Sequence, residues 1–247
     1  MRHTFGKTIV VSLGGSVVAP DGVNAKFVGE FKRLVEGFAR PVRSREGAQR
    51  ASASHGAKKG TKFLLIVGGG GVCRVYQRAA KELGKVTDAD GDWIGIYATR
   101  LNATLIRAVF GRLAAPELIE RRGQVEKLTS PVTVGGGWQP GWSTDFVATS
   151  LAHDFGAKEV INIGKPAFVY DKNPDAHKDA KPILEMSWRK YRAQMPKKWT
   201  PGFHAPVDPV AAKFCEKHGI TMFVVGADLK NLARLLKGEE FEGTIIR

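Results

Sequence analysis

Short apolar runs alternate with stretches of helical periodicity along this 247-residue chain, and that alternation limits the fold more than any other feature. A continuous run such as “FLLIV” at 63–67 is typical of a strand buried on both faces of a sheet. The predicted strands span 7–13, 63–67, 132–134, 159–163, 220–225 and 243–246. The predicted helices span 24–39, 72–83, 92–113, 144–155, 207–218 and 229–236.

Strands that alternate with helices are joined by right-handed crossovers, which build a mostly parallel sheet covered by helices on both faces. We therefore expect an α/β fold, and the length allows one large domain or two small ones. No apolar stretch approaches 18 residues, and no cleavage site follows the N-terminal run, so we expect neither a membrane span nor a signal peptide. The two cysteines, Cys73 and Cys215, form no disulfide framework, which fits a reducing, cytoplasmic setting.

Much of the positive charge is concentrated in one segment. The formal net charge is +14, and residues 40–62, with seven Lys or Arg and one Glu, contribute +6 of it. The segment is rich in Ala, Ser and Gly, which indicates a solvated, flexible loop inserted at 41–61. A nucleic-acid contact is the alternative, but no aromatic residues are interleaved for base stacking, which argues against that partner.

Three glycine clusters, at 14–15, 68–71 and 135–137, follow predicted strands and lie at or near the start of helices. Ligands bind beyond the carboxyl ends of the strands in such sheets. Glycine lets backbone amides approach an anion, and a helix N-terminus adds partial positive charge. Three clusters at equivalent positions favour a ligand with several phosphates over three plain turns. The first, “VSLGGS”, lacks the lysine of a P-loop, so the positive charge must come from elsewhere.

Six segments carry a resemblance to a known family: “SLGGSV”, “VGGGGVCR”, “DWIGIYATRLNA”, “GGGWQPGWSTD”, “VINIGKPAFVYDKNP” and “APVDPVAAK”. In this order, and with the ending “LKGEEFEGTIIR”, the chain resembles the uridylate (UMP) kinases of the amino-acid kinase superfamily, most of all their short archaeal branch. The resemblance covers nearly the whole chain except the basic loop. It implies one three-layer αβα sandwich over residues 1–247, phosphoryl transfer from ATP to UMP, Mg²⁺ with the ATP, and a hexamer.

The resemblance assigns a set of residues to UMP. Arg74 follows the second glycine cluster, where a guanidinium can bind a phosphate bidentately. Asp92 would bind the ribose hydroxyls, although a carboxylate at this place could instead cap a helix. Thr99 and Asn102 return near the same helical face and could line the pocket or pack. The full predicted UMP set is Gly69, Gly70, Arg74, Asp92, Thr99, Gly141, Ser143 and Thr144.

By the same resemblance, Lys165, Asp145 and Asp208 are the predicted catalytic residues. Phosphoryl transfer mostly needs charge placed around the moving group. Lys165 would supply that charge, and Asp145 would help organise the centre. Asp208 would fix the lysine, unless it is only an N-cap with proline after it. The residues predicted to bind ATP are Gly14, Gly15, Ser16, Tyr170 and Asn173.

One segment departs from the family pattern. Ala167 and Phe168 stand where the family has Asp-Gly, and Asn173 stands where it has an Asp. A change from Gly to Phe disfavours positive φ, so the local turn should differ, and the donor pocket with it. The six histidines show no metal-ligand spacing. We therefore expect Mg²⁺ to be held mainly by phosphates and water, with no protein ligand named.

Two other functions remain open from sequence. A kinase of the same superfamily that acts on isopentenyl phosphate would typically carry a histidine near the second glycine cluster, where “GGGGVCR” has none. A non-catalytic nucleotide-binding or storage protein on the same fold would account for the altered “AFVYDKNP” segment. The presence of Arg74, Asp145, Lys165 and Asp208 favours the UMP kinase.

Overall fold

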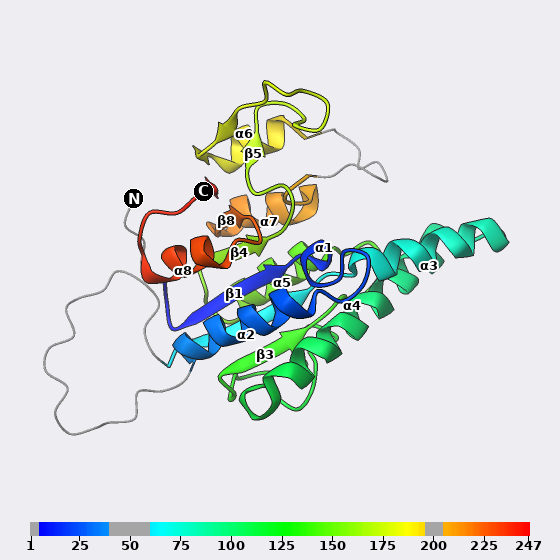
Figure 1. Ribbon diagram of the computed structural model, residues 1–247, viewed down its shortest axis with the longest axis horizontal. Coiled ribbons are helices and arrows are strands. Elements are labelled where there is room, and N and C mark those ends of the chain that lie inside the picture. Colours follow the sequence, from blue (N-terminus) through cyan, green and yellow to red (C-terminus); the bar gives the residue numbers. More distant parts are fainter. Residues whose placement is uncertain (1–4, 40–59, 196–204) are drawn as a thin grey trace, which may run out of the picture.

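The structure is a computed structural model that describes residues 5–39, 60–195 and 205–247 (Figure 1). Within these residues, seven strands form one sheet in the order β3-β2-β1-β4-β8-β9-β7, and β5 and β6 form a second, two-stranded sheet. The strands are β1 (Thr8–Leu13), β2 (Lys62–Val67), β3 (Val132–Gly135), β4 (Glu159–Ile163), β5 (Val169–Tyr170), β6 (Pro182–Ile183), β7 (Glu185–Met186), β8 (Thr221–Val225) and β9 (Thr244–Ile246). The helices are α1 (Gly15–Val18), α2 (Ala25–Ala39), α3 (Gly70–Leu83), α4 (Asp88–Phe110), α5 (Thr144–Asp154), α6 (Trp188–Ala193), α7 (Pro209–His218) and α8 (Leu229–Lys237), with a 3-10 turn at Gly111–Leu113.

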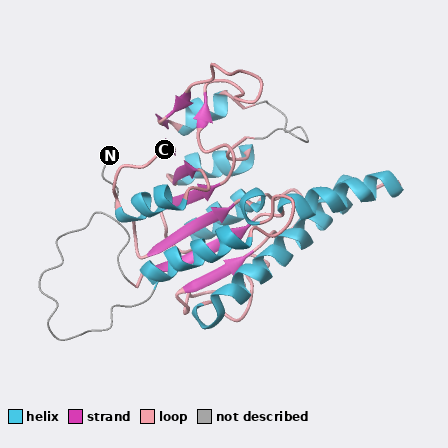
Figure 2. Cartoon of the chain, in the orientation of Figure 1, coloured by secondary structure: helices cyan, strands magenta, loops and turns pink. Residues whose placement is uncertain are grey.

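The large sheet is mostly parallel and lies between two layers of helices (Figure 2). Strands β3, β2, β1, β4 and β8 are parallel, β9 runs antiparallel to β8, and β7 runs parallel to β9. One apolar cluster packs α1, α2, α8 and the second half of α4 against one face. A second cluster packs α5, α6 and α7 against the other face. The α/β architecture expected from the sequence is confirmed.

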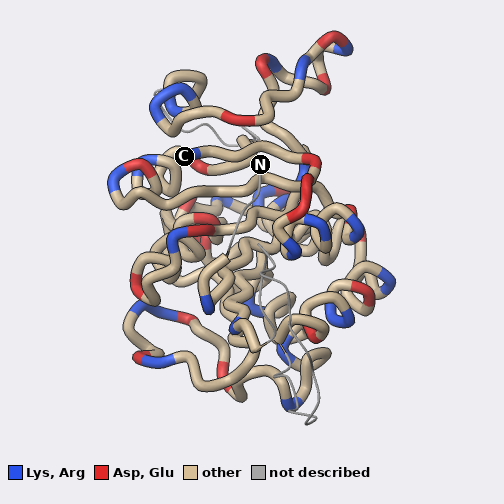
Figure 3. Tube along the Cα trace, turned by 90° about the vertical axis from the view of Figure 1, so that its left-hand side faces the viewer, with Lys and Arg blue, Asp and Glu red and all other residues tan. Residues whose placement is uncertain are grey.

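Charged side chains are distributed over the described part of the chain. Lys and Arg, and Asp and Glu, are scattered over many parts of the tube and do not gather on a single element (Figure 3). The predicted basic loop at 41–61 lies outside the described residues, apart from Gly60 and Thr61. In the three described ranges, no helix combines the length and the apolar character that a membrane span requires.

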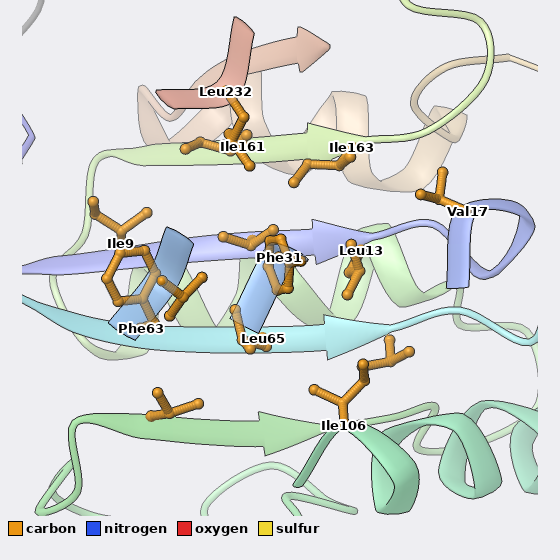
Figure 4. Close-up of a cluster of buried hydrophobic side chains, with 14 of the residues drawn as sticks. Ile9, Leu13, Val17, Phe31, Phe63, Leu65, Ile106, Ile161, Ile163 and Leu232 are labelled. Atoms are coloured by element: carbon orange, nitrogen blue, oxygen red, sulfur yellow. The ribbon is translucent and has the colours of Figure 1, made fainter. Parts of the chain in front are cut away.

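Side chains of the central strand β1 alternate between the two helical layers. Ile9 and Leu13 belong to the cluster beneath α2, together with Phe31 of that helix (Figure 4). Val10 belongs to the cluster on the α5 side. Residues two apart share a face of a strand, so Ser12 also lies on the α5 side, where it is 2% exposed. A hydroxyl group is thus buried next to the carboxyl end of β1.

All six predicted strands and five of the six predicted helices lie within two residues of their expected bounds. The exception is α4, for which the expected start at Asp92 is wrong. Thr87 caps this helix by accepting a hydrogen bond from the Asp90 amide at 3.1 Å, and Asp90 accepts one from the Thr87 amide at 3.0 Å. Strands of two residues leave no periodicity in the sequence, so β5, β6 and β7 were not predicted, and neither was α6.

Two glycine turns touch through their backbones at the carboxyl edge of the sheet. A Cβ atom on Gly15, after β1, would lie 2.1 Å from the Gly70 nitrogen. A Cβ atom on Gly68, after β2, would lie 2.5 Å from the Gly15 nitrogen. Gly70 also has a φ of +65°, which L side chains rarely adopt. Glycine is therefore required here by backbone packing, whatever ligand the turns bind.

The replacement Gly15→Ala is expected to lower the free energy of unfolding by about 1–3 kcal/mol or more, because the backbone must move to admit a methyl group. Gly29→Ala is the matched control, since Gly29 lies in α2 with no atom within 4 Å of a Cβ placed there. That control should raise the free energy of unfolding by about 0.5–1 kcal/mol. Urea unfolding of the two variants measures both effects, and a Gly15→Ala protein as stable as wild type would contradict the packing argument.

Candidate functional site

A cavity of about 1110 Å³ opens beside the two glycine turns. Its wall on the sheet side contains these turns together with Arg74 and Thr144, and the opposite wall is residues 165–175, around β5. A smaller cavity of about 170 Å³ adjoins it, and the two have Ser16, Thr144 and Lys165 in common. The strands β1, β2 and β4 all end at this place, as expected for a ligand site in a parallel sheet.

Each of the residues predicted to bind ATP lines one of these two cavities: Gly14, Gly15, Ser16, Tyr170 and Asn173. The ring of Tyr170 lies edge-on to that of Phe168, with 6.1 Å between their centroids. An aromatic pair therefore occupies the segment that departs from the family pattern. The Asn173 side chain accepts a hydrogen bond from the Asp175 amide at 2.9 Å, so part of its capacity is used in a local turn.

Four residues of the predicted UMP set also line the larger cavity: Gly69, Gly70, Arg74 and Thr144. Arg74 lies near the start of α3, and its side chain is exposed. Its Nη2 donates to the Pro20 carbonyl at 3.3 Å. A guanidinium has five N–H donors, so this single contact leaves the charged fork available to an anion.

Asp92 joins α4 to the loop before α5. Its Oδ2 accepts a hydrogen bond from the Gly141 amide at 2.7 Å. The cap of α4 is Thr87, one turn earlier, so the alternative that Asp92 caps the helix is wrong. Two residues of the predicted UMP set, Asp92 and Gly141, are thus brought together, although neither lines the two cavities.

Two other polar residues of α4 hold the glycine turns. The Thr99 hydroxyl is buried, donates to the Ile96 carbonyl at 2.6 Å and accepts from the Gly137 amide at 2.6 Å. The Asn102 side chain donates to the carbonyls of Gly68 at 2.8 Å and Gly69 at 3.0 Å. Of the two alternatives left open for these residues, the contacts favour packing. The assignment of Thr99 to UMP stays a prediction that this geometry does not support.

Asp145 is held from two neighbouring strands. The Ser12 hydroxyl of β1 donates to Asp145 Oδ1 at 2.7 Å. The Asn162 side chain of β4 donates to the same oxygen at 3.3 Å and to the Pro206 carbonyl at 2.7 Å. Asp145 lies in the first turn of α5 and lines the smaller cavity together with Lys165.

Asp208 is the N-cap of α7. Its Oδ1 accepts hydrogen bonds from the amides of Val210 at 2.8 Å and Ala211 at 3.1 Å, and its Oδ2 accepts one from the Ser143 hydroxyl. Ser143 in turn caps α5 by accepting from the Phe146 amide at 3.0 Å. The Ser143 hydroxyl therefore ties two helix N-termini together and, like Thr99, does not line either cavity.

The two carboxylates affect each other. Burial of the Asp145 carboxyl group and, next, the negative charge of Asp208 raise the pKa of Asp145 to about 7. The hydrogen bond from Ser12 and the backbone amide of Asp208 act in the opposite direction, because they stabilise the charged form. The pKa of Asp145 in the unliganded protein therefore lies well above that of an ordinary aspartate.

Lys165 lies where β4 ends and lines both cavities. Throughout the described ranges it forms no ion pair with either Asp145 or Asp208. The partners of Asp208 are Ser143 and the amides of α7, not a lysine. The predicted catalytic roles of these three residues stay predictions, although the structure brings Asp145 and Lys165 to one cavity.

Among the described residues, no group of three or more His, Cys, Asp or Glu is arranged so that it could hold a metal ion. The carboxylates that line the two cavities are Asp145, Asp171 and Asp175, and hydroxyl groups come from residues such as Ser16 and Thr144.

A model of the amino acid kinase family matches residues 7–226. The chain belongs to the amino acid kinase family. Among its relatives, the uridylate kinase of Methanoregula boonei is 31% identical over 240 residues, which cover 94% of each chain. The uridylate kinase of Hyperthermus butylicus is 34% identical over 190 residues, or 76% of this chain and 83% of that one. The crystal structure of uridylate kinase from Archaeoglobus fulgidus superposes with a TM-score of 0.77 at 28% identity, covering 97% of this chain and all of the other. The resemblance expected from the six motifs is confirmed.

The sequence did not lead us to two site residues of this amino acid kinase family member. They are Ser12 and Asn162, and both are hydrogen-bond partners of Asp145. A signal was present in both cases. Each is the polar residue within an apolar strand, “KTIVVSL” and “EVINI”, and each is almost fully buried, at 2% and 6% exposure. A buried polar group needs a hydrogen-bond partner, so these positions pointed to a polar centre beneath α5.

The replacement Asp145→Asn should stabilise the unliganded protein more at pH 8 than at pH 5. The folded-state pKa of Asp145 is raised above the ordinary value of 3.8 to about 7, so ionising this group in the folded protein becomes a penalty as the pH rises through that range. The amide carries no such penalty. Thermal melts should show a midpoint difference between variant and wild type that grows from pH 5 to pH 8. A difference that stays constant with pH would contradict the raised pKa.

Proposed function

We propose that this chain is a UMP kinase, which transfers the γ-phosphoryl group of ATP to UMP and yields UDP and ADP. The observation that carries the proposal is that one cavity joins four of the five residues predicted to bind ATP with Arg74. Uridylate kinases that align with nearly the whole chain support it. The reaction belongs to pyrimidine nucleotide biosynthesis.

The two ends of the cavity suit the two nucleotides. The glycine turn after β1 and the segment with Tyr170 and Asn173 would bind ATP, with backbone amides directed to its phosphates. Arg74, beside the second glycine turn, would bind the UMP phosphate bidentately. Asp92 and Gly141, already joined to each other, would take the ribose and base.

The chemical step needs little beyond position and charge. An oxygen of the UMP phosphate forms a bond to the γ-phosphorus while the bond from that phosphorus to the bridging oxygen of ATP breaks, and ADP leaves. Lys165 lines both cavities, so its ammonium would neutralise charge on the transferring group. The UMP phosphate is already ionised, so no proton has to be removed from the acceptor. Asp145 would organise the centre from the smaller cavity, and Asp208 would act on it through their mutual repulsion.

The cavity fits a Mg²⁺ ion that is carried by ATP. This ion usually keeps several waters and binds substrate phosphates, and the described residues offer no protein cluster that would compete for it. When bound, Mg²⁺ would neutralise the β- and γ-phosphates. Glycine amides, Ser16 and Lys165 would then orient the triphosphate.

We also propose that the protein is a cytoplasmic hexamer of single-domain chains over residues 1–247. The outer surface of α3 and α4 supports an assembly, because it exposes large apolar side chains: Val75, Tyr76, Trp93, Tyr97 and Leu101. Three of them, at 93, 97 and 101, form one stripe on α4. Multi-angle light scattering measures the mass, and a monomer would contradict this part of the proposal.

A coupled assay of ADP release tests the activity. The purified protein with ATP and Mg²⁺ should turn over UMP far better than CMP or isopentenyl phosphate. Preference for isopentenyl phosphate would support the alternative kinase. Nucleotide binding without turnover of any acceptor would support the storage protein.

The replacement Arg74→Gln should raise the KM for UMP by about 10- to 150-fold, because a charged hydrogen bond contributes roughly 1.5–3 kcal/mol. The KM for ATP should change little. Arg78→Gln is the matched control, since Arg78 lies one turn further along α3, is exposed and does not line the cavity. Equal effects of the two replacements in steady-state kinetics would remove Arg74 from the acceptor site.

A further inference from the structure

We propose that Ser12 is a positioning residue for phosphoryl transfer, whose hydroxyl fixes the ionised Asp145 carboxylate beside Lys165. This inference rests on the proposed function, because it concerns a residue that acts through Asp145 in that reaction. The resemblance to uridylate kinases assigned no role to Ser12, which carries no charge and lines the smaller cavity beside Asp145.

The contact is specified by the register of the sheet. Ser12 and Asn162 are direct partners on the parallel strands β1 and β4. Both donate to the same oxygen, Oδ1, of Asp145, and Asp145 belongs to helix α5. No described side chain donates to Oδ2. Two strands thus hold one oxygen of a carboxylate that also receives the backbone amide of Asp208 and that lines the smaller cavity together with Lys165.

Ser12 makes the shorter of the two side-chain hydrogen bonds to Asp145. Its hydrogen bond is 2.7 Å long, against 3.3 Å for that of Asn162, and Asn162 makes a shorter contact with the Pro206 carbonyl at 2.7 Å. The terminal torsion of an aspartate is soft and roughly two-fold. Without Ser12, only the longer Asn162 contact and the backbone amide of Asp208 would hold the carboxyl group, so its orientation toward the cavity would be less sharply defined.

The surroundings explain why a donor is needed at this place. The titratable groups that face Asp145 are Asp208 at the start of α7, Cys215 within α7, Tyr191 of α6 and Lys165 after β4. Burial and Asp208 disfavour the charged form of Asp145, and the Ser12 hydroxyl favours it. The Ser12 hydrogen bond therefore lowers the pKa of Asp145 against the effects of burial and Asp208, which increases the ionised fraction of this carboxyl group near neutral pH.

The test is the pH dependence of kcat/KM for Ser12→Ala. Loss of the hydroxyl donor should raise, by about one pH unit, the pH at which kcat/KM reaches half of its maximum on the acid side of the profile. This shift lowers kcat/KM at pH 7 by up to about tenfold. At pH 9 the variant should approach wild type. Ser12→Thr keeps the hydroxyl and should restore the wild-type profile. Ser12→Cys, with a weak S–H donor, should give an intermediate shift in the same direction.

Ser150→Ala is the matched control. Ser150 is a fully buried residue of α5 whose hydroxyl has no hydrogen-bond partner among the described residues, so its removal deletes a buried oxygen without touching Asp145. Its profile should match wild type. An equal loss of activity at every pH in Ser12→Ala, or a shifted profile in Ser150→Ala, would overturn the proposal.

Two further measurements separate this inference from the proposed function. Carbon-13 NMR of the Asp145 carboxyl in the unliganded protein needs no activity, and Ser12→Ala should raise that pKa. In an Asp145→Asn background, Ser12→Ala should cause no further loss of kcat. Unchanged NMR titration, or additive losses in the double variant, would refute the role of Ser12. Absence of UMP turnover with a shifted titration would refute only the proposed function.

Discussion

The close approach of two glycine turns is the contact on which the rest of the site depends. The turns after β1 and β2 lie so near that a Cβ atom on Gly15 would overlap the backbone at Gly70. The ends of β1, β2 and β4 are also linked, since Gly14 donates to the Ile163 carbonyl at 2.7 Å and Gly68 to the Leu13 carbonyl at 2.9 Å. Three chain segments that are distant in sequence therefore leave the sheet at one place. Any side chain there would separate them and open the cavity wall.

Helix α4 fixes this arrangement from one side. Along one face it carries Asp92, Thr99 and Asn102, which contact the backbone of Gly141, Gly137 and the turn at 68–69 in that order. The helix thus links the second and third glycine turns and holds one relative to the other. Of these three residues only Asp92 is exposed enough to be shared with a ligand, because the other two are buried. Residues that resemble a substrate site in sequence can therefore have structural partners instead.

On the opposite face of the sheet, a polar layer is enclosed in the apolar core beneath α5. Ser12, Asn162, Asp145 and Asp208 lie among residues of the second apolar cluster, and two carboxylates share this small space. Such a group of charges costs stability, which proteins accept mainly where chemistry requires it. The raised pKa of Asp145 is the direct result of that enclosure. The same enclosure would strengthen the electrostatic effect of Asp145 on any charged group bound in the smaller cavity.

Local pattern determined the α/β class, the bounds of most elements and the glycine turns, because apolar periodicity and backbone restrictions act over a few residues. Motif order and spacing also identified the family and named Arg74, Lys165 and the residues predicted to bind ATP, all of which line one or both of two adjoining cavities. The partners of each polar side chain were decided only by the tertiary structure. Hydrogen bonds such as that from Ser12 to Asp145 join residues 133 positions apart, and they depend on strand register and helix packing, which no local pattern encodes. For the same reason, the sequence did not reveal that the Thr99 hydroxyl contacts the backbone of Ile96 and Gly137 and that the Ser143 hydroxyl contacts Asp208, while their binding of UMP stays a prediction.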